Sequence, residues 1–323
     1  MTAPQFPEIE LALISSAISG DAGKLYRIAS DLMEGGVPFD SVLFDYLIAA
    51  EKSVGQRWAQ GDYLVAEEHA VTASIETVIS LLTGMFDQSD DAPLVVVATA
   101  EGDDHSLPAR AAAAHLVYLG YRTTFLGAGL PSDDLREFLE IEPPVTLVLS
   151  VAMTTHLLGA RAVVVAAHEV GVPVLVGGKG LGSDGQWSEA VGADAYVGSL
   201  RDVAGIVDTW VRDERPQIKQ VGELSPGLER LMAARSAILA GAQQSLDAPR
   251  LRDEVSLLLG AIEGALLTGD DQVAVDMLDW QEKTLAAHGL DGSAVVEALA
   301  SPLAELSDEG SAALTRVREA RSS

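Results

Sequence analysis

The side chains best suited to holding a cofactor fall in two groups along the chain. Trp58 is followed after nine residues by Glu68-His69, and Asp103-Asp104-His105 comes soon after an apolar run at residues 94–98. A neutral imidazole can coordinate a metal through one ring nitrogen while a carboxylate accepts a hydrogen bond from the other. We therefore predict that His105 is a metal ligand and that Asp103 orients it.

Helical spacing of apolar residues in the first part of the chain predicts the element that carries Trp58, Glu68 and His69. Residues 8–87 show this spacing, with stop signals at Gly20-Asp21, Gly35-Gly36 and Gly61-Asp62. The connections are short, which favours an antiparallel four-helix bundle. We expect Gly61 to end the third helix in the left-handed conformation and Asp62 to cap the fourth.

From residue 93 onward the apolar pattern changes to short continuous runs. They lie at residues 94–99, 123–126, 145–150, 174–176 and 195–197, and helical stretches follow them at 108–118, 132–140, 157–169, 187–190 and 201–213. Strands without alternation, each followed by a helix, are typical of a parallel sheet covered on both faces. Five such units predict a flavodoxin-like doubly wound five-stranded sheet, whose ligands bind at the carboxyl ends of the strands.

A polar break at residues 217–226 separates this sheet from a last helical part. Residues 227–320 read as helix in about four segments, divided at 247–249, 269–270 and 289–292. We therefore predict an α/β plus all-α protein with three domains. These are a helical cap bundle at 1–90, a Rossmann-like cofactor domain at 91–216 and a C-terminal helical domain at 217–323.

The composition limits the partners of the chain. With 21 basic and 48 acidic residues the formal net charge is −27, so direct binding to nucleic acid or to a membrane is not expected. The sequence contains no cysteine, which excludes disulfides, thiolate metal sites and a thioether-linked chromophore. No signal peptide and no apolar run of about 20 residues is visible, so we expect a cytoplasmic protein.

Each candidate site also has an ordinary explanation. His105 could belong to a solvated acidic loop, because Glu101, Asp103 and Asp104 lie beside it. Ser150-Val151-Ala152 and Gly177-Gly178 end the third and fourth predicted strands. These small residues could open a slot for a flat heterocycle beside the first strand, or they could simply form tight turns. Trp58 could close a bundle end while Glu68-His69 faces water.

The combination resembles the cobalamin-binding domain family of methionine synthase, adenosylcobalamin mutases and CarH-like regulators. The family pattern is Asp-x-His-x-x-Gly, then Ser-x-Leu, then Gly-Gly; here Pro108 stands for the first glycine and Ala152 for the leucine. The resemblance implies that His105 replaces dimethylbenzimidazole as the lower cobalt ligand. It also implies that the displaced nucleotide tail enters a slot near Ser150, Gly177 and Gly178. Pro108 is tolerable if it is the first residue of its helix.

The spacing Trp-x9-Glu-His resembles the lid of CarH-type light-sensing regulators, and this likeness covers roughly residues 8–215. It implies that adenosylcobalamin binds with Trp58 over its upper face and with Glu68 and His69 near the adenosyl group. Blue or green light would break the Co–C bond and the lid would rearrange. Ala59 stands where the DNA-binding relatives have a histidine that captures cobalt afterwards, which leaves water or His69 as the upper ligand.

The C-terminal helices suggest a second ligand or an output function. No winged helix-turn-helix pattern precedes the bundle, so the architecture resembles the photocobilins, which pair cobalamin with biliverdin. Any bilin would be bound non-covalently. Trp280 and His288 could line a planar pocket, or they could be plain core and surface residues. The same two alternatives hold for the candidate propionate partners Arg230, Arg235, Arg250 and Arg252.

Taken together, the sequence predicts a non-catalytic cobalamin photoreceptor. A light-driven change would alter its homo-oligomeric state or its binding to a downstream protein, with adenosylcobalamin as chromophore and biliverdin as a possible second one. No Walker loop, Gly-x-Ser-x-Gly or His-Glu-x-x-His motif is present. The alternatives are a corrinoid shuttle of a methyltransferase system, which needs an open upper face, and a scaffold that binds no cofactor.

Overall fold

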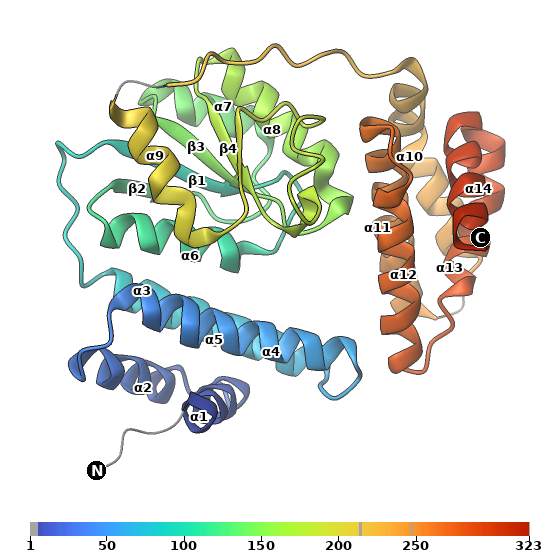
Figure 1. Ribbon diagram of the computed structural model, residues 1–323. Helices are drawn as coiled ribbons and strands as arrows, with labels where there is room; N and C mark the ends of the chain where they lie inside the picture. Colours follow the sequence, from blue (N-terminus) through green and yellow to red (C-terminus); the bar gives the residue numbers. More distant parts are fainter. Residues whose placement is uncertain (1–5, 213–214, 247, 323) are drawn as a thin grey trace.

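Three groups of elements make up the computed structural model of the protein: the N-terminal helices, the sheet with its covering helices, and the C-terminal helices (Figure 1). The structure describes residues 6–212, 215–246 and 248–322, without the side chains of residues 6, 7, 250 and 322. Residues 1–5 lie outside this range, and the expected absence of a signal peptide rests mainly on them. Residue 247, which is part of the predicted break at 247–249, also lies outside it. The N-terminal helices lie below the sheet and the C-terminal helices stand beside it.

The N-terminal part is the predicted four-helix bundle. It consists of α1 (Phe6–Ile18), α2 (Ala22–Glu34), a third helix in three sections and α5 (Val65–Thr83). The third helix runs through α3 (Phe39–Ser41), a π-helical section η1 (Val42–Leu47) and α4 (Ile48–Ala59). Leucine, isoleucine and valine side chains from all four helices form one buried core, which also takes in Leu107, Ala111 and Ala114 of the sheet domain.

Of the two caps predicted between α4 and α5, the left-handed Gly61 is confirmed and the Asp62 cap is wrong. Gly61 has a φ of +83° after α4, as expected for the left-handed end of a helix. Asp62 does not cap α5, because that helix begins three residues later, beyond the reach of an N-cap side chain. Instead the backbone N–H of Leu64 donates to the Glu67 carboxylate at 2.8 Å.

The sheet has the predicted flavodoxin-like topology. Its strands are β1 (Leu94–Thr99), β2 (Arg122–Phe125), β3 (Thr146–Ser150), β4 (Val174–Gly177) and β5 (Ala195–Val197). They are all parallel and follow the order β2-β1-β3-β4-β5. This confirms the fold class, and it places the carboxyl ends of β1, β3 and β4 side by side.

Helices cover both faces of this sheet. On one face α6 (Ser106–Tyr118) and α9 (Val203–Arg212) pack on Val95 and Val97. On the other face α7 (Ser132–Ile141) and α8 (Leu157–Glu169) pack on Val96 and Ala98. Alternate residues of β1 therefore feed two different cores, which explains why the strand is apolar throughout.

Two local predictions in the sheet domain are wrong. Residues 187–190 do not form a helix; they lie in turns, where the buried Trp187 side chain fixes the segment against the core. A short 3₁₀ turn, η3 (Lys179–Leu181), lies upstream instead. The helix after His105 begins at Ser106, so Pro108 is its third residue and not its first. A proline is tolerated there because the first N–H groups of a helix have no intrahelical partner.

The C-terminal part contains one helix more than predicted. Its helices are α10 (Pro226–Gln244), α11 (Pro249–Thr268), α12 (Gln272–Ala287), α13 (Ser293–Leu306) and α14 (Asp308–Ser322). The division between α13 and α14 was missed because Ser307 alone breaks the helix with an extended backbone, and no glycine or proline marks the place. The apolar core of these helices is continuous with the sheet core beneath α7 and α8.

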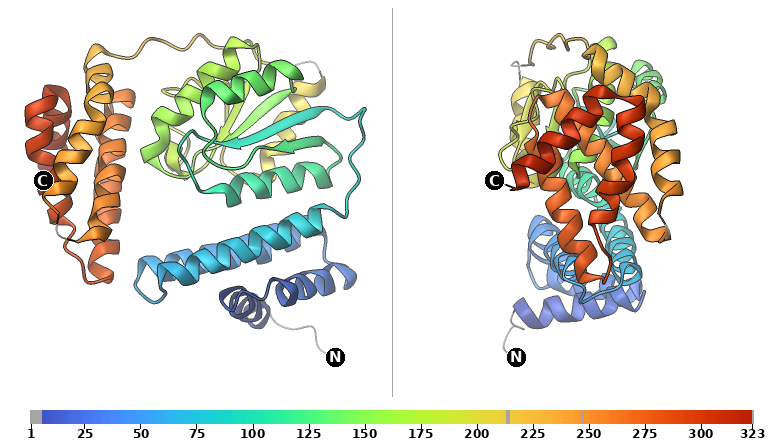
Figure 2. Two further views of the ribbon diagram at one scale, coloured as in Figure 1. Left: turned by 180° about the vertical axis from the view of Figure 1, so that it is seen from behind. Right: turned by 90° about the vertical axis from the view of Figure 1, so that its right-hand side faces the viewer.

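The two views in Figure 2 show the C-terminal helices standing across the carboxyl edge of the sheet and reaching down to the bundle. We propose the ranges 1–90, 91–216 and 217–323 as the domain division. Within the described residues no helix is long and apolar enough to cross a membrane.

Candidate metal and cofactor site

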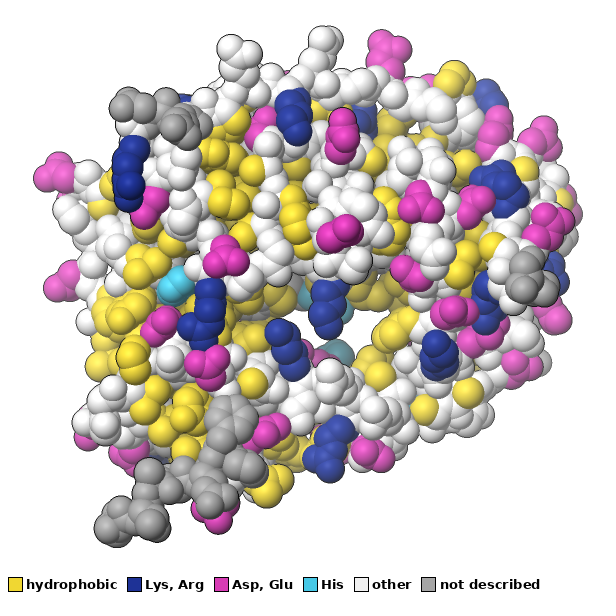
Figure 3. Space-filling view, in the orientation of Figure 1, with side chains coloured by type: hydrophobic (Ala, Val, Ile, Leu, Met, Phe, Trp, Pro, Cys, Tyr) yellow, Lys and Arg dark blue, Asp and Glu magenta, His cyan; other side chains and the backbone are white. Residues whose placement is uncertain are grey.

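The central opening lies at the edge where a doubly wound sheet binds ligands. Figure 3 shows it between the bundle, the sheet and the C-terminal helices, with lysine or arginine side chains on its rim, histidines inside it and apolar side chains on its C-terminal side. The loop from β1 to α6 carries Asp103 and His105 to this opening. The N-terminal helices close the opening from the opposite side.

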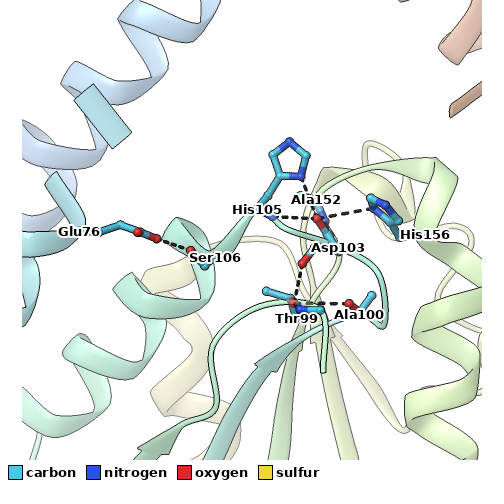
Figure 4. Close-up of polar contacts among 9 residues, drawn as sticks. Glu76, Thr99, Ala100, Asp103, His105, Ser106, Ala152 and His156 are labelled. Atoms are coloured by element: carbon cyan, nitrogen blue, oxygen red, sulfur yellow. Dashed lines mark hydrogen bonds and ion pairs between the residues drawn. The ribbon is translucent and has the colours of Figure 1, made fainter. Parts of the chain in front are cut away.

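The His105 ring is fixed through one nitrogen and left free at the other. Its Nδ1 lies 2.8 Å from the Asp103 carboxylate, whose same oxygen accepts the His105 backbone N–H at 3.1 Å. No described residue makes a hydrogen bond to Nε2, and the side chain is 54% exposed. Figure 4 shows the ring pointing away from the sheet into open space. This is the geometry of a metal-ligating histidine with a carboxylate behind it.

Asp103 is itself held by the strand ends. It is fully buried, its other carboxylate oxygen accepts the Ala152 N–H at 2.8 Å, and its carbonyl accepts the Thr99 hydroxyl at 2.7 Å. Burial alone would raise the pKa of Asp103, but the hydrogen bonds from His105 and from the Ala152 N–H, together with the nearby His156 imidazole, outweigh it and lower the pKa well below its usual range. Its hydrogen bond in turn raises the pKa of His105, which makes the imidazole a more basic ligand.

A second histidine shares the same carboxylate. His156 lies in η2 (Thr154–His156), just after β3, and its Nδ1 is 3.5 Å from the Asp103 oxygen that pairs with His105. The two imidazole centroids are 6.5 Å apart. Two imidazoles therefore lie beside one buried carboxylate at the strand ends.

The protein offers one metal ligand here and not a cage. The described residues contain no group of three or more histidines, cysteines, aspartates or glutamates arranged to hold an ion. One exposed imidazole is a weak site for a free metal, because protein metal sites normally use three or four ligands. It suits a metal that arrives with most of its ligands in a macrocycle and lacks an axial one.

Small residues let the neighbouring strand ends pack closely. Ser150 pairs with Thr99 on one side and Gly177 on the other. Gly178 has a φ of +120°, and a Cβ there would lie 2.2 Å from the Val151 carbonyl oxygen. The structure therefore gives Gly178 a packing reason to be glycine. The role of Ser150, Gly177 and Gly178 beside a nucleotide tail stays a prediction.

In the bundle, Trp58 is contacted by residues of the C-terminal helices. It lies in the last turn of α4, and its ring centroid is 6.1 Å from that of Trp280 and 5.8 Å from that of His288. The His288 Nε2 lies 2.9 Å from the Trp58 carbonyl oxygen. The structure thus brings together Trp58, Trp280 and His288, which the sequence indicated only as separate candidates.

Glu68 and His69 lie in the first two turns of α5. The His69 Nδ1 is 2.8 Å from one Glu68 oxygen, and the Thr72 hydroxyl donates to the other at 3.0 Å. Glu68 is half-buried, whereas the His69 side chain is 74% exposed. The negative charge of Glu68 contributes to the raised pKa of His105, so this carboxylate acts across the opening on the candidate ligand.

Glu51 is a residue of this site that the sequence reasoning missed. It shares a face of α4 with Gly55 and Trp58, at spacings of four and seven residues. Burial, and then the charge of Glu68, raise the pKa of Glu51. Counting back from Trp58 along the helix face would have identified this position.

The arginines suggested as propionate partners are engaged within the C-terminal helices. Arg230 pairs with Glu309, Arg235 pairs with the buried Glu263, and Arg252 donates to the Leu246 carbonyl at 3.4 Å. The Arg250 side chain lies outside the described residues. A propionate would have to replace these partners, so that part of the prediction has no support from the geometry.

A doubly wound domain with one oriented imidazole at its carboxyl edge, covered by a four-helix bundle, is suited to bind a metal macrocycle. Residues 93–207 match a family model described as B12 binding domain, and residues 10–83 match a second model with the same description. The chain therefore carries a B12-binding module in two parts, and its cofactor is a cobalamin or a related corrinoid. The exposed His105 Nε2 and the buried Asp103 fit this group.

Two kinds of protein are among the relatives of this chain. Trimethylamine corrinoid protein 1 of Methanosarcina mazei is 26% identical over 189 residues, which are 56% of this chain and 87% of that protein. The HTH-type transcriptional repressor CarH of Myxococcus xanthus is 35% identical over 112 residues, 32% of this chain and 34% of the repressor. Monomethylamine corrinoid protein of Methanosarcina barkeri has the same fold, with a TM-score of 0.52 and 20% identity over 62% of this chain and 98% of its own.

Proposed function

We propose that this protein is a light-responsive cobalamin-binding protein and not itself a catalyst. His105 would hold the cobalt from below, and Trp58 would cover the upper axial side of adenosylcobalamin. The observation that carries the proposal is the tie between this lid and the C-terminal domain, where Trp58 contacts Trp280 and His288. A lid that is joined to a further domain can pass a change at the cofactor to the rest of the molecule.

Some residues of the chain would hold the cofactor, and others would respond to a change in it. Adenosylcobalamin, when bound, supplies a Co–C bond that blue or green light breaks. Trp58 would then lose its contact with the adenosyl group, and the change would reach Trp280 and His288 through the contacts that Trp58 already makes with them. Ala59 has no side-chain atom that could bind cobalt. His69, the next histidine after Trp58 in the lid, could face the upper side of the cofactor instead. The change would alter the homo-oligomeric state or the binding of a downstream protein, in the cytoplasm.

Biliverdin is the proposed second chromophore. Trp280 and His288 are both partly exposed, and they lie at the junction between the C-terminal helices and the lid. Flat aromatic side chains of this kind can stack on a planar ligand. A bilin would be bound without a covalent link, since the chain has no cysteine.

The second candidate is a corrinoid shuttle of a methyltransferase system. The specific observation in its favour is the likeness to trimethylamine corrinoid protein 1, which spans 56% of this chain. A shuttle must present the upper face of its corrinoid to partner enzymes. The ties between Trp58 and the C-terminal domain favour the light-responsive protein over this candidate.

Spectra of the reconstituted protein separate these functions. We expect protein loaded with adenosylcobalamin in the dark to change its absorbance under green light without any substrate, together with a change in mass by light scattering. A photostable methyl-corrinoid form that passes its methyl group to an enzyme partner would support the shuttle. Protein that stays colourless after incubation with cobalamin and biliverdin would support a scaffold and contradict both.

A further inference from the structure

We propose that His288 and Trp280 of the C-terminal domain are positioning residues that hold Trp58 over the upper side of the cofactor site. This inference rests on the proposed function, because it assigns the C-terminal helices a part in that same site. The bundle alone would then provide an incomplete lid. Three separate contacts between α4 and α12 carry the argument.

The first contact joins two helix ends. Trp58 lies in the last turn of α4, where carbonyl groups lack their usual intrahelical partners. The Trp58 carbonyl accepts the Gly61 N–H at 2.9 Å, and the His288 Nε2 lies at the same distance from it. His288 is the residue that ends α12. A hydrogen bond from its imidazole therefore fixes the backbone from which the Trp58 side chain projects.

The second contact orients the indole itself. The Trp58 ring makes tilted contacts with the rings of Trp280 and His288, at interplanar angles of 46° and 38°. Trp280 packs against the core of the C-terminal domain, so it gives the indole a firm neighbour. All three residues are partly exposed. The cluster thus keeps a free surface that a bound ligand could meet.

The third contact depends on a glycine. Gly61, in the turn between α4 and α5, would place a Cβ only 2.7 Å from the Ala287 carbonyl oxygen. Its φ of +83° independently disfavours a side chain. The lid turn therefore lies directly against the end of α12. Any larger residue here would push the lid away from the C-terminal domain.

The C-terminal domain is also anchored to the sheet edge that carries the lower ligand. Gly260 and Gly264 of α11 let this helix approach the η2 backbone, where added Cβ atoms would lie 2.8 Å from Thr155 O and 3.2 Å from Thr154 O. The Trp187 Nε1 donates to Asp270 at 2.9 Å. The domain thus bridges the sheet edge to the lid, and it sets the height of Trp58 above the site.

Binding of two cobalamins tests this role. Adenosylcobalamin presents a bulky upper group, whereas hydroxocobalamin does not. For His288→Ala and for Trp280→Ala we expect the Kd of adenosylcobalamin to rise about threefold to tenfold, as for the loss of one good contact. We expect the Kd of hydroxocobalamin, and the spectrum of histidine-ligated cobalt, to stay as in the parent protein. His288→Gln, which keeps a donor, should recover part of the loss.

Asp270→Asn is the matched control, because it weakens a contact of the same domain away from the lid. It should leave the ratio of the two dissociation constants unchanged. An equal weakening of both cobalamins by His288→Ala would mean a general structural role and would overturn the proposal. A ratio unchanged from the parent protein in His288→Ala and in Trp280→Ala would overturn it as well.

A readout without cofactor separates this inference from the proposed function. The indole N–H signal of Trp58 in an NMR spectrum of the apoprotein can be assigned by its absence in Trp58→Phe. We expect His288→Ala to shift or broaden that signal and to leave the signal of the distant Trp210 in place. If this holds but green light has no effect on the loaded protein, the light response fails and the positioning role stands. An unmoved Trp58 signal would contradict the positioning role.

Discussion

The proposed lower and upper halves of the cofactor site are built in different ways. Below, His105 and the buried Asp103 lie two residues apart, and the strand ends hold them through the Ala152 N–H and the Thr99 hydroxyl. Above, Trp58 depends on a histidine 230 residues further along the chain, and the His69 side chain is largely exposed. One half is made of local, buried contacts and the other of contacts between domains.

Under the proposed function, the lower half would hold the cofactor and the upper half would respond to a change in it. Local unfolding and domain motion draw on regions with few buried contacts, while buried and fully bonded groups stay fixed. The lower half should therefore keep its geometry in every state of the protein. The upper half is where a change at the cofactor can move a helix end.

The largest effect should come from removing the lower ligand. In His105→Ala we expect cobalt to lose its histidine ligand. The absorption spectrum of bound adenosylcobalamin should then fail to shift to that of the histidine-ligated form. His69→Ala, which alters the exposed lid histidine, is the control and should keep that shift. A normal shift in His105→Ala would show that His105 is not the lower cobalt ligand.

The carboxylate behind the ligand should matter next. In Asp103→Asn the amide can no longer stabilise the imidazole as a buried charge does, so we expect cobalamin affinity to fall about 10-fold to 100-fold. Titration followed by absorbance would measure this change. Asp104→Asn removes a neighbouring exposed charge and should have a much smaller effect. Equal losses in both variants would point to general electrostatics in place of ligand orientation.

The upper half should show a weaker and more selective effect. In Trp58→Ala we expect weaker binding of adenosylcobalamin, or a smaller change of assembly under light, while the histidine-ligated spectrum persists. Light scattering in the dark and after green illumination would measure the assembly. Parent-like binding and assembly in this variant would show that the lid side of the comparison is wrong.

The smallest effect concerns stability and pH. Because the pKa of Glu51 is raised, the folded protein binds this proton more tightly than the unfolded chain. The stability that this group contributes is present below the ordinary glutamate pKa of about 4.3 and is lost as the pH rises through the raised value. Glu51→Gln should therefore gain stability relative to the parent protein as the pH rises to neutrality. Urea unfolding at both ends of this range tests the sign, and a constant difference would contradict it.

Much of the fold could be predicted because its signals are local. The apolar runs of β1 and β5 matched the strands, and the helix over residues 157–169 was placed at its observed bounds. The pairing of Asp103 with His105 also follows from their short spacing after a strand. The predicted cap at Asp62 and the predicted helix at 187–190 are wrong, and the break at Ser307 was missed, because tertiary packing decides these features.

The upper half of the site could not be assembled from the sequence in the same way. Trp280 and His288 stood out only as residue types, and nothing local indicates that they meet Trp58. Counting back from Trp58 finds the helix face of Glu51, but the influence of the Glu68 charge on it depends on how α4 packs against α5. The close approach at Gly260 and Gly264 likewise depends on how α11 meets η2. Contacts between separate domains carry no fixed spacing that a single sequence could reveal.

A crystal structure of the protein grown with adenosylcobalamin in the dark tests the central claim most directly. We predict cobalt bound from below by the His105 Nε2, with Asp103 still on Nδ1 and with Trp58 over the other axial side in contact with His288. A structure in which the His105 imidazole turns away from the metal, or in which Trp58 lies far from the corrinoid, would contradict this account.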